Sequence, residues 1–359
     1  MGKTVSPLAT PASLAIFSIL FASIATTASA QDMERHFSGK VIAIIVGSPP
    51  GGGVDTTARL YAQYAGKHHP GKPRFVVQNV TGGGQLRALQ TGARAKPDGL
   101  TVASLHTRWA VQSIMGKDLD GFDVRTARVI GSPVADRRPG IVCADRKIFG
   151  SWRDVLASKR QLTVGASEAG DRRNLGAAVL ELLGAPVKNI YGYTGSTESM
   201  AAFDRGELNG VACAEDIVPR QYPEWLTQKR LAPLFWWTAQ PDDAYIARMA
   251  ATEKPVHVFD LPGVAATEEM KTALHLTEQM FLFTRALVLP PKTPDDIYQA
   301  WKAAYEATIQ DPEFVAAAAK GGIDVSLGRA EEYAAAIRDA GKLSAAGLEM
   351  FQKLMGDGN

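Results

Sequence analysis

The first part of the chain indicates a buried parallel sheet, because apolar runs alternate there with glycine-rich turns and helical patterns. Residues 41–46 form a continuous β-branched run of the kind that parallel sheets cover on both faces. A glycine- and proline-rich turn follows at 47–53, and from Asp55 apolar side chains recur at helical spacing. Two more strand patterns, 75–77 and 100–105, flank a second helical stretch. Repeated strand–loop–helix units predict an α/β fold with crossover helices.

The alternation begins again after the proline- and arginine-containing junction at 136–140. A second series of strand patterns follows, separated by helical stretches, and this restart suggests a second lobe. These strand patterns lie at 141–144, 162–165, 190–193 and 210–214. Alanine-rich helical stretches complete the chain after Pro290.

The amino terminus has the pattern of a secretory signal peptide. Lys3 is followed by an apolar stretch at 14–24 and then by Ala28-Ser29-Ala30, which predicts cleavage after Ala30. A retained membrane anchor is disfavoured, because the apolar stretch is shorter than the roughly 20 residues that a spanning helix needs. We expect residues 1–30 to be removed and the mature protein to be periplasmic.

Charge and cysteine content set two further limits. The formal net charge of +2 argues against a nucleic-acid partner or a polybasic membrane surface. The only cysteines are Cys143 and Cys213, and each lies in an apolar run read as a strand of the same lobe. An oxidising compartment permits a disulfide between them, but both could equally be buried as small apolar side chains. The sequence leaves these alternatives open.

Glycines and hydroxyl-bearing residues gather at the strand-to-helix junctions. Ligands of open α/β sheets bind at the carboxyl ends of the strands, which is where these junctions fall. Helix amino termini there expose unpaired N–H groups and a positive dipole end, which suit an anion, and glycines let a ligand approach the backbone. Turn formation alone explains any single junction, but the recurrence of this composition at five junctions favours a binding site. The junctions are 48–56, 81–85, 106–108, 167–174 and 194–197.

Catalytic motifs are incomplete. Gly53 is followed by Val54 and Asp55 rather than by the Lys-Ser/Thr of a phosphate-binding loop, and the glycine spacing of a dinucleotide site also fails. The segment 165–170 is one residue too long for a nucleophile elbow. The six histidines show no metal-ligand spacing. The sequence therefore supplies no complete catalytic motif and no metal-ligand spacing.

Short motifs also follow one another in the order of a known family. They are GSPPGGGVD at 47–55, VQN at 77–79, GGG at 82–84, AKPDGLT at 95–101, YTG at 193–195, GELNG at 206–210 and PPKTP at 290–294. In these motifs the chain resembles the Bug receptors, the substrate-binding proteins of tripartite tricarboxylate transporters. The resemblance implies a two-lobed periplasmic binding protein of the type II-like class, with a ligand cleft between the lobes and no catalysis or cofactor. It also implies a small carboxylate ligand and membrane transporter subunits as partners.

Together with the restart after Pro139, the family pattern predicts a discontinuous first lobe. Lobe 1 is expected at 31–137 plus 241–359, and lobe 2 at 138–240.

Carried over by position, the resemblance also implies the ligand-binding residues. These are Ser48, Pro49, Pro50, Gly51, Gly52, Gly53, Asp55 and Thr56 in the first loop, Gly83 and Gly84 in the second, His106 and Thr107 in the third, and Ser167, Gly170, Thr194, Gly195, Ser196 and Asp216 in the second lobe. The 167–174 junction departs from the family in carrying charged residues, and we hypothesise that Arg172 or Arg173 pairs with a second carboxylate of the ligand.

The most specific expectation concerns the helix that begins near Asp55. One ligand carboxylate is expected to rest on its amino terminus, held by the backbone N–H groups of residues 52–56. The negative charge of Asp55 would repel an anion, so we interpret it as a helix N-cap. The alternative is that Asp55 accepts a hydrogen bond from an amine or hydroxyl of the ligand.

Two other functions remain as alternatives to a transport receptor. A ligand-sensing module that signals occupancy to a partner would have the same fold and the same site. An exported hydrolase would need a nucleophile with a base within reach, and the sequence supplies no motif for one.

Overall fold

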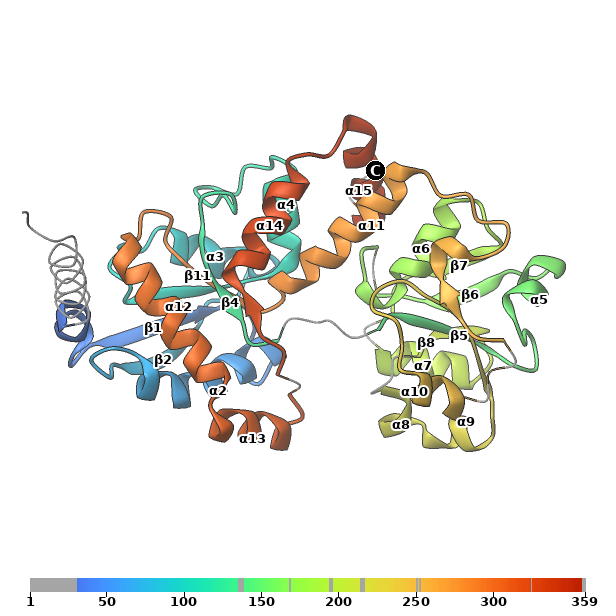
Figure 1. Cartoon of the computed structure of the whole chain (residues 1–359), viewed down its shortest axis with the longest axis horizontal. Coiled ribbons are helices and arrows are strands. Elements are labelled where there is room, and N and C mark those ends of the chain that lie inside the picture. The colour runs from blue at the N-terminus through green and yellow to red at the C-terminus, as the bar shows by residue number, and fades with distance from the viewer. Residues whose placement is uncertain are drawn as a thin grey trace, which may run out of the picture. The chain divides into compact units, whose positions relative to one another are not determined.

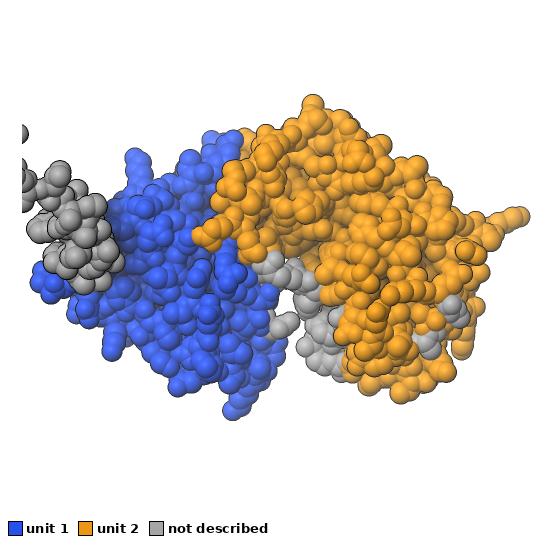
Figure 2. All heavy atoms as spheres, in the orientation of Figure 1, with its two compact units in different colours: residues 1–109, 118–134, 285–330 blue, residues 110–117, 135–284, 331–359 orange. Residues whose placement is uncertain are grey.

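Two six-stranded mixed sheets organise the chain (Figure 1). The computed structural model describes residues 31–134, 139–167, 169–193, 196–213, 217–249, 251, 253–323 and 325–356. The chain divides into two units, coloured separately in Figure 2. Unit 1 comprises the described residues of Met1–Trp109, Asp118–Val134 and Arg285–Ala330, and unit 2 those of Ala110–Lys117, Ala135–Thr284 and Glu331–Asn359.

The sheet of unit 1 has the order β12-β4-β11-β3-β1-β2. Its strands are β1 (Val41–Val46), β2 (Arg74–Asn79), β3 (Thr101–Leu105), β4 (Arg128–Ser132), β11 (Ala286–Leu289) and β12 (Gly328–Arg329). β1 is parallel to both β2 and β3, as the alternation of strand and helix patterns predicts. β11 is antiparallel to β3 and β4, so the later segment of chain extends the sheet in the opposite direction.

Helices cover the sheet of unit 1. They are α2 (Gly53–His68), the 3₁₀ turn η1 (Gly83–Gln85), α3 (Leu86–Ala93), α4 (Thr107–Ile114), of which only the first three residues belong to unit 1, α12 (Asp295–Ile309) and α13 (Pro312–Lys320). α2 packs against α12 and α13.

The core of unit 1 is aromatic. Tyr61 of α2 and Tyr305 of α12 lie with their ring centroids 5.7 Å apart, and both are buried. Trp301 is fully buried and donates its indole N–H to the Gly99 carbonyl at 3.0 Å. Burial of each large apolar side chain contributes roughly 1.5–3 kcal/mol. This packing fixes α2, and therefore its first turn, against the sheet.

The sheet of unit 2 has the order β10-β9-β5-β8-β6-β7. Its strands are β5 (Ile141–Asp145), β6 (Leu162–Gly165), β7 (Val187–Ile190), β8 (Gly210–Ala212), β9 (Leu231–Trp236) and β10 (Val256–His257). The strand expected at 190–193 ends where it was expected to begin, because β7 pairs with β6 through Val187 to Ile190. Gly192, with φ of 105°, then leaves the extended conformation.

The helical elements of unit 2 complete the fold. They are α5 (Trp152–Ala157), η2 (Arg172–Asn174), α6 (Leu175–Leu182), α7 (Ser196–Asp204), α8 (Ile217–Gln221), α9 (Pro223–Thr227), α10 (Asp243–Arg248), η3 (Val258–Asp260), α11 (Glu268–Met280), η4 (Phe281–Phe283), α14 (Ala330–Ala340) and α15 (Ala345–Met355). No helix in the described chain combines the length and apolar character needed to cross a membrane.

The two units are bounded differently from the lobes expected from the sequence. Residues 241–284 and 331–356, which the sequence boundaries place in lobe 1, belong to unit 2. β10 pairs with β9, and α11 and α15 pack against each other and against α6. Tyr333 of α14 donates a hydrogen bond to the Leu282 carbonyl at 2.5 Å. Tertiary packing in the second half of the chain accounts for this difference.

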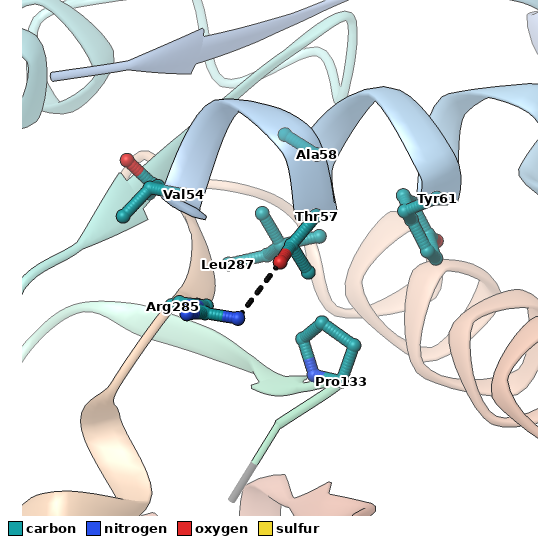
Figure 3. Close-up of a pocket in the computed structure, with 8 residues that line it drawn as sticks. Val54, Thr57, Ala58, Tyr61, Pro133, Arg285 and Leu287 are labelled. Atoms are coloured by element: carbon teal, nitrogen blue, oxygen red, sulfur yellow. Dashed lines mark hydrogen bonds between the residues drawn. The ribbon is translucent and has the colours of Figure 1, made fainter. Parts of the chain in front are cut away.

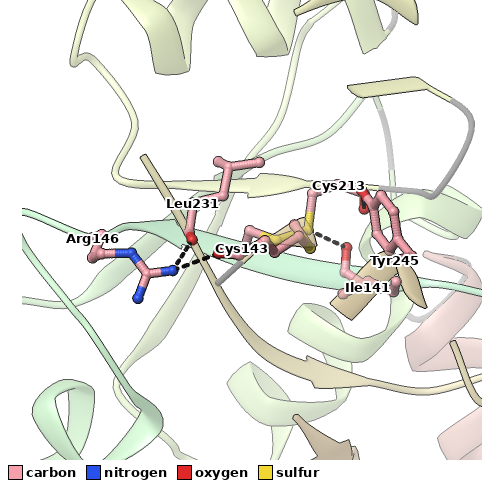
Figure 4. The surroundings of a disulfide bond; sticks show 7 residues. Ile141, Cys143, Arg146, Cys213, Leu231 and Tyr245 are labelled. Carbon is pink, nitrogen blue, oxygen red and sulfur yellow. Dashed lines mark hydrogen bonds between the residues drawn. A yellow bond between two sulfur atoms is a disulfide. The ribbon is translucent and has the colours of Figure 1, made fainter. Parts of the chain in front are cut away.

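Unit 2 contains a disulfide between Cys143 and Cys213 (Figure 4). Cys143 lies in β5, and Cys213 directly follows β8, the antiparallel neighbour of β5. Their Cα atoms are 5.8 Å apart, within the range that a disulfide spans, and both residues are fully buried. The two cysteines therefore belong to one sheet region, and of the two alternatives the structure has the bonded one.

Candidate functional site

Three of the loops singled out in the sequence meet at one edge of the unit 1 sheet. β2, β1 and β3 are adjacent and parallel, so their carboxyl ends share that edge. The Trp109 indole N–H, from the start of α4, donates to the Gly84 carbonyl at 2.7 Å. A Cβ on Gly47 would lie 2.4 Å from Cβ of Gln85, so the first two loops are in direct contact. This edge is the candidate site of unit 1.

The first turn of α2 leaves few backbone N–H groups for a ligand. Gly52 is the N-cap residue, and its N–H donates to the Pro49 carbonyl at 3.1 Å. The Asp55 N–H donates to the Ser48 hydroxyl at 3.1 Å, and the Thr56 N–H to the carbonyl of Gly52 at 2.8 Å.

The two residues between Gly52 and Asp55 keep their backbone N–H groups free. In the described chain, the N–H groups of Gly53 and Val54 have no hydrogen-bond partner. The expected set of N–H donors at 52–56 is therefore too broad, because the loop itself uses three of them. Gly53 and Val54 are left to meet an anion at the positive end of the helix dipole.

Asp55 is not the N-cap of α2, and that interpretation was wrong. The residue lies in the first turn, and its carboxylate points back to accept the N–H of Gly51 at 2.8 Å. It also accepts hydrogen bonds from Arg59 Nε at 2.9 Å and from Asn79 Nδ2 at 2.8 Å. Arg59 first, and then Asn79 and Gly51, lower the pKa of Asp55 to about 2 against the opposing effect of burial. Its charge is thus compensated within the protein.

The second and third loops adopt backbone conformations that explain their composition. Gly82, Gly83, Gly84 and Gln85 all have positive φ, at 128°, 56°, 58° and 77°. Three consecutive glycines permit such a path at low cost, whereas Gln85 adopts the left-handed region despite its side chain. At the third loop, His106 Nδ1 accepts the N–H of Arg108 at 3.3 Å and so stabilises the start of α4, while Thr107 is buried.

Sequence reasoning missed Arg285, which lies 230 positions from Asp55 in the chain and beside the first turn of α2 (Figure 3). Its Nη1 donates to the Thr57 hydroxyl at 2.9 Å, and that hydroxyl donates to the Gly53 carbonyl at 2.8 Å. A Cβ on Gly53 would lie 3.0 Å from Nη2 of Arg285. The available signal was a cation placed immediately before the apolar run 286–289, but the sequence did not indicate its contact with α2.

A small cavity adjoins Arg285 beneath α2. Its volume of ≈ 10 Å³ is about that of one water-sized group. The residues that line it are Val54, Thr57, Ala58, Tyr61, Ser104, Pro133, Arg285 and Leu287 (Figure 3). Ser104 is 4% exposed, and its hydroxyl has no hydrogen-bond partner among the described residues.

The 167–174 junction of unit 2 is largely satisfied by its own residues. Asp171 accepts hydrogen bonds from the N–H and hydroxyl of Ser167 at 3.1 and 2.8 Å. It also pairs with Arg173, whose Nη2 lies 2.5 Å from its carboxylate. Burial of Asp171 opposes ionisation, but Arg173 and Ser167 outweigh it and the pKa is lowered. Arg173 is thereby committed to an ion pair.

Arg172 and Gly170 lie against other parts of unit 2. The Arg172 guanidinium is 5.8 Å from the ring centroid of Phe281, and its charge opposes the rise in the pKa of Glu278 that burial causes. A Cβ on Gly170 would lie 3.2 Å from Met355 of α15. The hypothesis that Arg172 binds a second carboxylate stays a prediction.

The remaining expected residues of unit 2 are only partly described. Ser196 begins α7, and its carbonyl accepts the Ser199 hydroxyl at 3.1 Å. Thr194, Gly195 and Asp216 lie outside the described residues. Among the residues that are described, no group of three or more His, Cys, Asp or Glu side chains is arranged to hold a metal ion.

Comparison with known proteins adds evidence on the fold. No protein-family model and no curated protein matches the sequence. Among solved structures, the chain is similar to a TctC solute-binding protein from Polaromonas, with a TM-score of 0.60, 19% identity and coverage of 86% of this chain and 98% of that one. It is also similar to the periplasmic binding protein BugD, with a TM-score of 0.52, 16% identity and coverage of 89% and 98%.

A third similar structure is MatC from Rhodopseudomonas palustris with bound malate, at a TM-score of 0.51, 16% identity and coverage of 89% of this chain and 100% of that one. The fold class expected from the sequence is confirmed by these likenesses. With its two α/β units, each built on a six-stranded mixed sheet, the chain has the fold of the periplasmic solute-binding proteins.

Proposed function

We propose that the protein is a periplasmic receptor of the Bug type, which captures a small organic acid for a tripartite tricarboxylate-type transporter. The observation that carries the proposal is the first turn of α2. There the N–H groups of Gly53 and Val54 have no partner in the described chain and lie at the positive end of the helix. Loops from three parallel strands meet at this edge of the sheet. An anion is the ligand that matches the positive end of the helix and its free N–H donors.

Three further observations support a carboxylate as that anion. The motif series along the sequence resembles the Bug receptors, and the similar MatC structure holds malate. Asp55, the acidic residue of the first turn, is ion-paired with Arg59 and hydrogen-bonded to Asn79, so its charge does not oppose an incoming anion at full strength. Expected partners are the membrane subunits of the transporter, and residues 1–30 are expected to direct export.

We also infer that the protein is a binding protein rather than an enzyme. The sequence lacks the motif of a nucleophile with an activating base. Ser104 is the buried hydroxyl next to Arg285, but a guanidinium cannot serve as the general base that a serine nucleophile needs, since it stays protonated. The hydrolase alternative is tested directly by incubating the protein with ester and amide substrates and assaying for product.

A thermal-shift screen of organic acids tests the proposal. The panel is acetate, lactate, succinate, malate, glutarate and citrate, each paired with a neutral amide of similar size. A ligand that binds only the folded state stabilises it by about 2.7 kcal/mol at a hundredfold excess over Kd. We expect at least one acid to raise Tm with the logarithm of its concentration while its amide does not. If every acid leaves Tm unchanged, the receptor function is refuted.

A further inference from the structure

The backbone of Arg285 is held in an unusual conformation. Its φ of 60° lies in the left-handed region, which glycine and asparagine enter at lower cost than arginine does. The residue lies in the turn between η4 and β11, and glycine would adopt this turn conformation at lower cost. The conformation therefore points to a use for the arginine side chain rather than for the turn.

That side chain brings a positive charge to the start of a helix. Arg285 lies at the amino-terminal turn of α2, where the helix dipole is positive and a cation is destabilising. Nη1 is fixed there by the Thr57 hydroxyl. An anion between the guanidinium and the unpartnered N–H groups of Gly53 and Val54 would interact favourably with both.

Gly53 lets the guanidinium come close to the helix backbone. Its Cβ, if present, would lie 3.0 Å from Arg285 Nη2, closer than side-chain contacts normally allow. A larger residue at this position would push the guanidinium away from the first turn. The absence of a side chain at Gly53 therefore lets both Arg285 and a ligand come close to the backbone of the first turn.

A second and independent feature of the same place is Ser104. Ser104 of β3 pairs directly with Leu287 of β11, so the two side chains share one face of the sheet and line the cavity beside Arg285. The Ser104 hydroxyl is buried without a hydrogen-bond partner in the described chain, which is costly unless something else occupies the cavity. The cavity accommodates one water-sized group.

From these observations we infer that Arg285 is a ligand-binding residue that makes the receptor selective for an ionised carboxylate. The carboxylate lies between the Arg285 guanidinium and the N–H groups of Gly53 and Val54. One oxygen of the acid enters the adjoining cavity and bonds with the Ser104 hydroxyl. This inference rests on the proposed function, and it specifies which groups of unit 1 recognise the charge.

Titration calorimetry with succinate, or with the tightest-binding acid of the panel, tests the inference in four variants. Arg285→Gln should weaken binding roughly ten- to a hundredfold, because a charge-assisted interaction is lost, and Arg285→Lys should retain part of the affinity. Arg285→Gln should also make the affinity less sensitive to salt. Ser104→Ala should weaken binding about three- to tenfold while the Tm of the unliganded protein stays the same or rises, because the hydroxyl it removes has no partner.

Gly53→Ala distinguishes a loss of binding from a folding defect in the arginine variants. Alanine is the better helix former, so Tm should not fall, yet displacement of the guanidinium should weaken binding. Arg74→Gln, at an exposed arginine of β2, is the matched control and should bind as the wild type does. The inference is overturned if Arg285→Gln and Gly53→Ala both bind within threefold of wild type. Absence of binding by the wild-type protein itself would instead refute the proposed function.

Discussion

Arg59 donates from Nε to the Asp55 carboxylate at 2.9 Å, one turn further along α2. Asp55 also accepts the N–H of Gly51 and the amide of Asn79, so one carboxylate joins α2, the loop that precedes it and the end of β2. The arrangement lowers the pKa of Asp55 to about 2. This carboxylate organises the loop of the candidate site without facing an anion as an uncompensated charge.

Asp55→Asn should therefore destabilise the protein, in contrast to the small effect expected for an N-cap. The folded pKa of Asp55 lies below its ordinary value of 3.8, so its contribution of about 2 kcal/mol is fully present above pH 3.8 and is lost as pH falls toward 2. Urea unfolding at pH 7 should show a loss of about 1–3 kcal/mol. Asp120→Asn, at an exposed ion pair with Arg94, is the control and should change little. Equal stability of the two variants would contradict this role.

The disulfide should contribute strongly to the stability of unit 2. Cys143 and Cys213 close a loop with a sequence separation of 70, for which chain entropy gives about 4 kcal/mol. The double variant Cys143→Ala, Cys213→Ala should lose free energy of unfolding of that order. Reductant should shift the unfolding midpoint of the wild type but not of the variant. Two titratable thiols in the unreduced, denatured wild type would show that the bond does not form.

How far the sequence predicts the fold depends on whether the determining contacts are local. The strand at 41–46 and the loop after it follow from adjacent residues, a β-branched run and then glycines, and the structure has both. β7 was misplaced, because Ile190 and Tyr191 are as apolar as a strand requires and only the pairing with β6 fixes its position. β10 and α11 are likewise held by distant partners, since β10 pairs with β9 and α11 packs against α15.

The candidate site shows the same difference between features set by local contacts and features set by distant ones. Its glycine-rich loops were predictable, because left-handed backbone at Gly82 to Gly84 demands glycine locally. Asn79, at the end of β2, hydrogen-bonds to Asp55. The two residues become neighbours only once β1 and β2 pair. Arg285 reaches α2 through the antiparallel β11, which the sequence showed only as an apolar run. Contacts that depend on sheet assembly have no signature in a single sequence.

His69 should make unit 1 sensitive to acid. It is 2% exposed and packs edge-on against Phe37 and Trp301, and burial lowers its pKa to about 4. The unfolded chain, with an ordinary histidine pKa near 6.5, binds the proton first, so stability is constant above about pH 6.5 and falls by roughly 3 kcal/mol toward pH 4.

Substitution isolates this effect of His69. His69→Phe keeps an aromatic ring in the cluster and removes the titration, so its free energy of unfolding should decline less between pH 6.5 and pH 4 than that of the wild type. His275→Gln, at an exposed histidine of α11, is the matched control for the substitution and should keep the wild-type free energy of unfolding at pH 7. Parallel profiles for wild type and His69→Phe would show that His69 does not titrate in this way.

Glu278 should have the opposite effect and lower the stability of the protein as pH rises from 4.5 to 8. The carboxyl group lies largely buried on α11, and Oε1 has no hydrogen-bond partner in the described chain. Burial raises its pKa to about 8, although the charge of Arg172 acts in the other direction. Because the folded pKa exceeds the ordinary value of 4.5, the folded state favours the protonated form. The stability that the protonated Glu278 carboxyl confers is fully present below pH 4.5 and is lost as pH rises through 8.

Glu278→Gln tests this expectation, because the amide resembles the protonated carboxyl in shape but does not ionise. The variant should match the wild type near pH 4.5 and exceed its free energy of unfolding at pH 9, by a difference on the order of 5 kcal/mol. Glu268→Gln, at an exposed position in the first turn of the same helix, should show no such gain at pH 9. Chemical unfolding of the three proteins at pH 4.5, 7 and 9 gives the comparison. A Glu278→Gln variant that is no more stable than the wild type at pH 9 would mean that Glu278 ionises freely, through contact with Arg172 or with solvent.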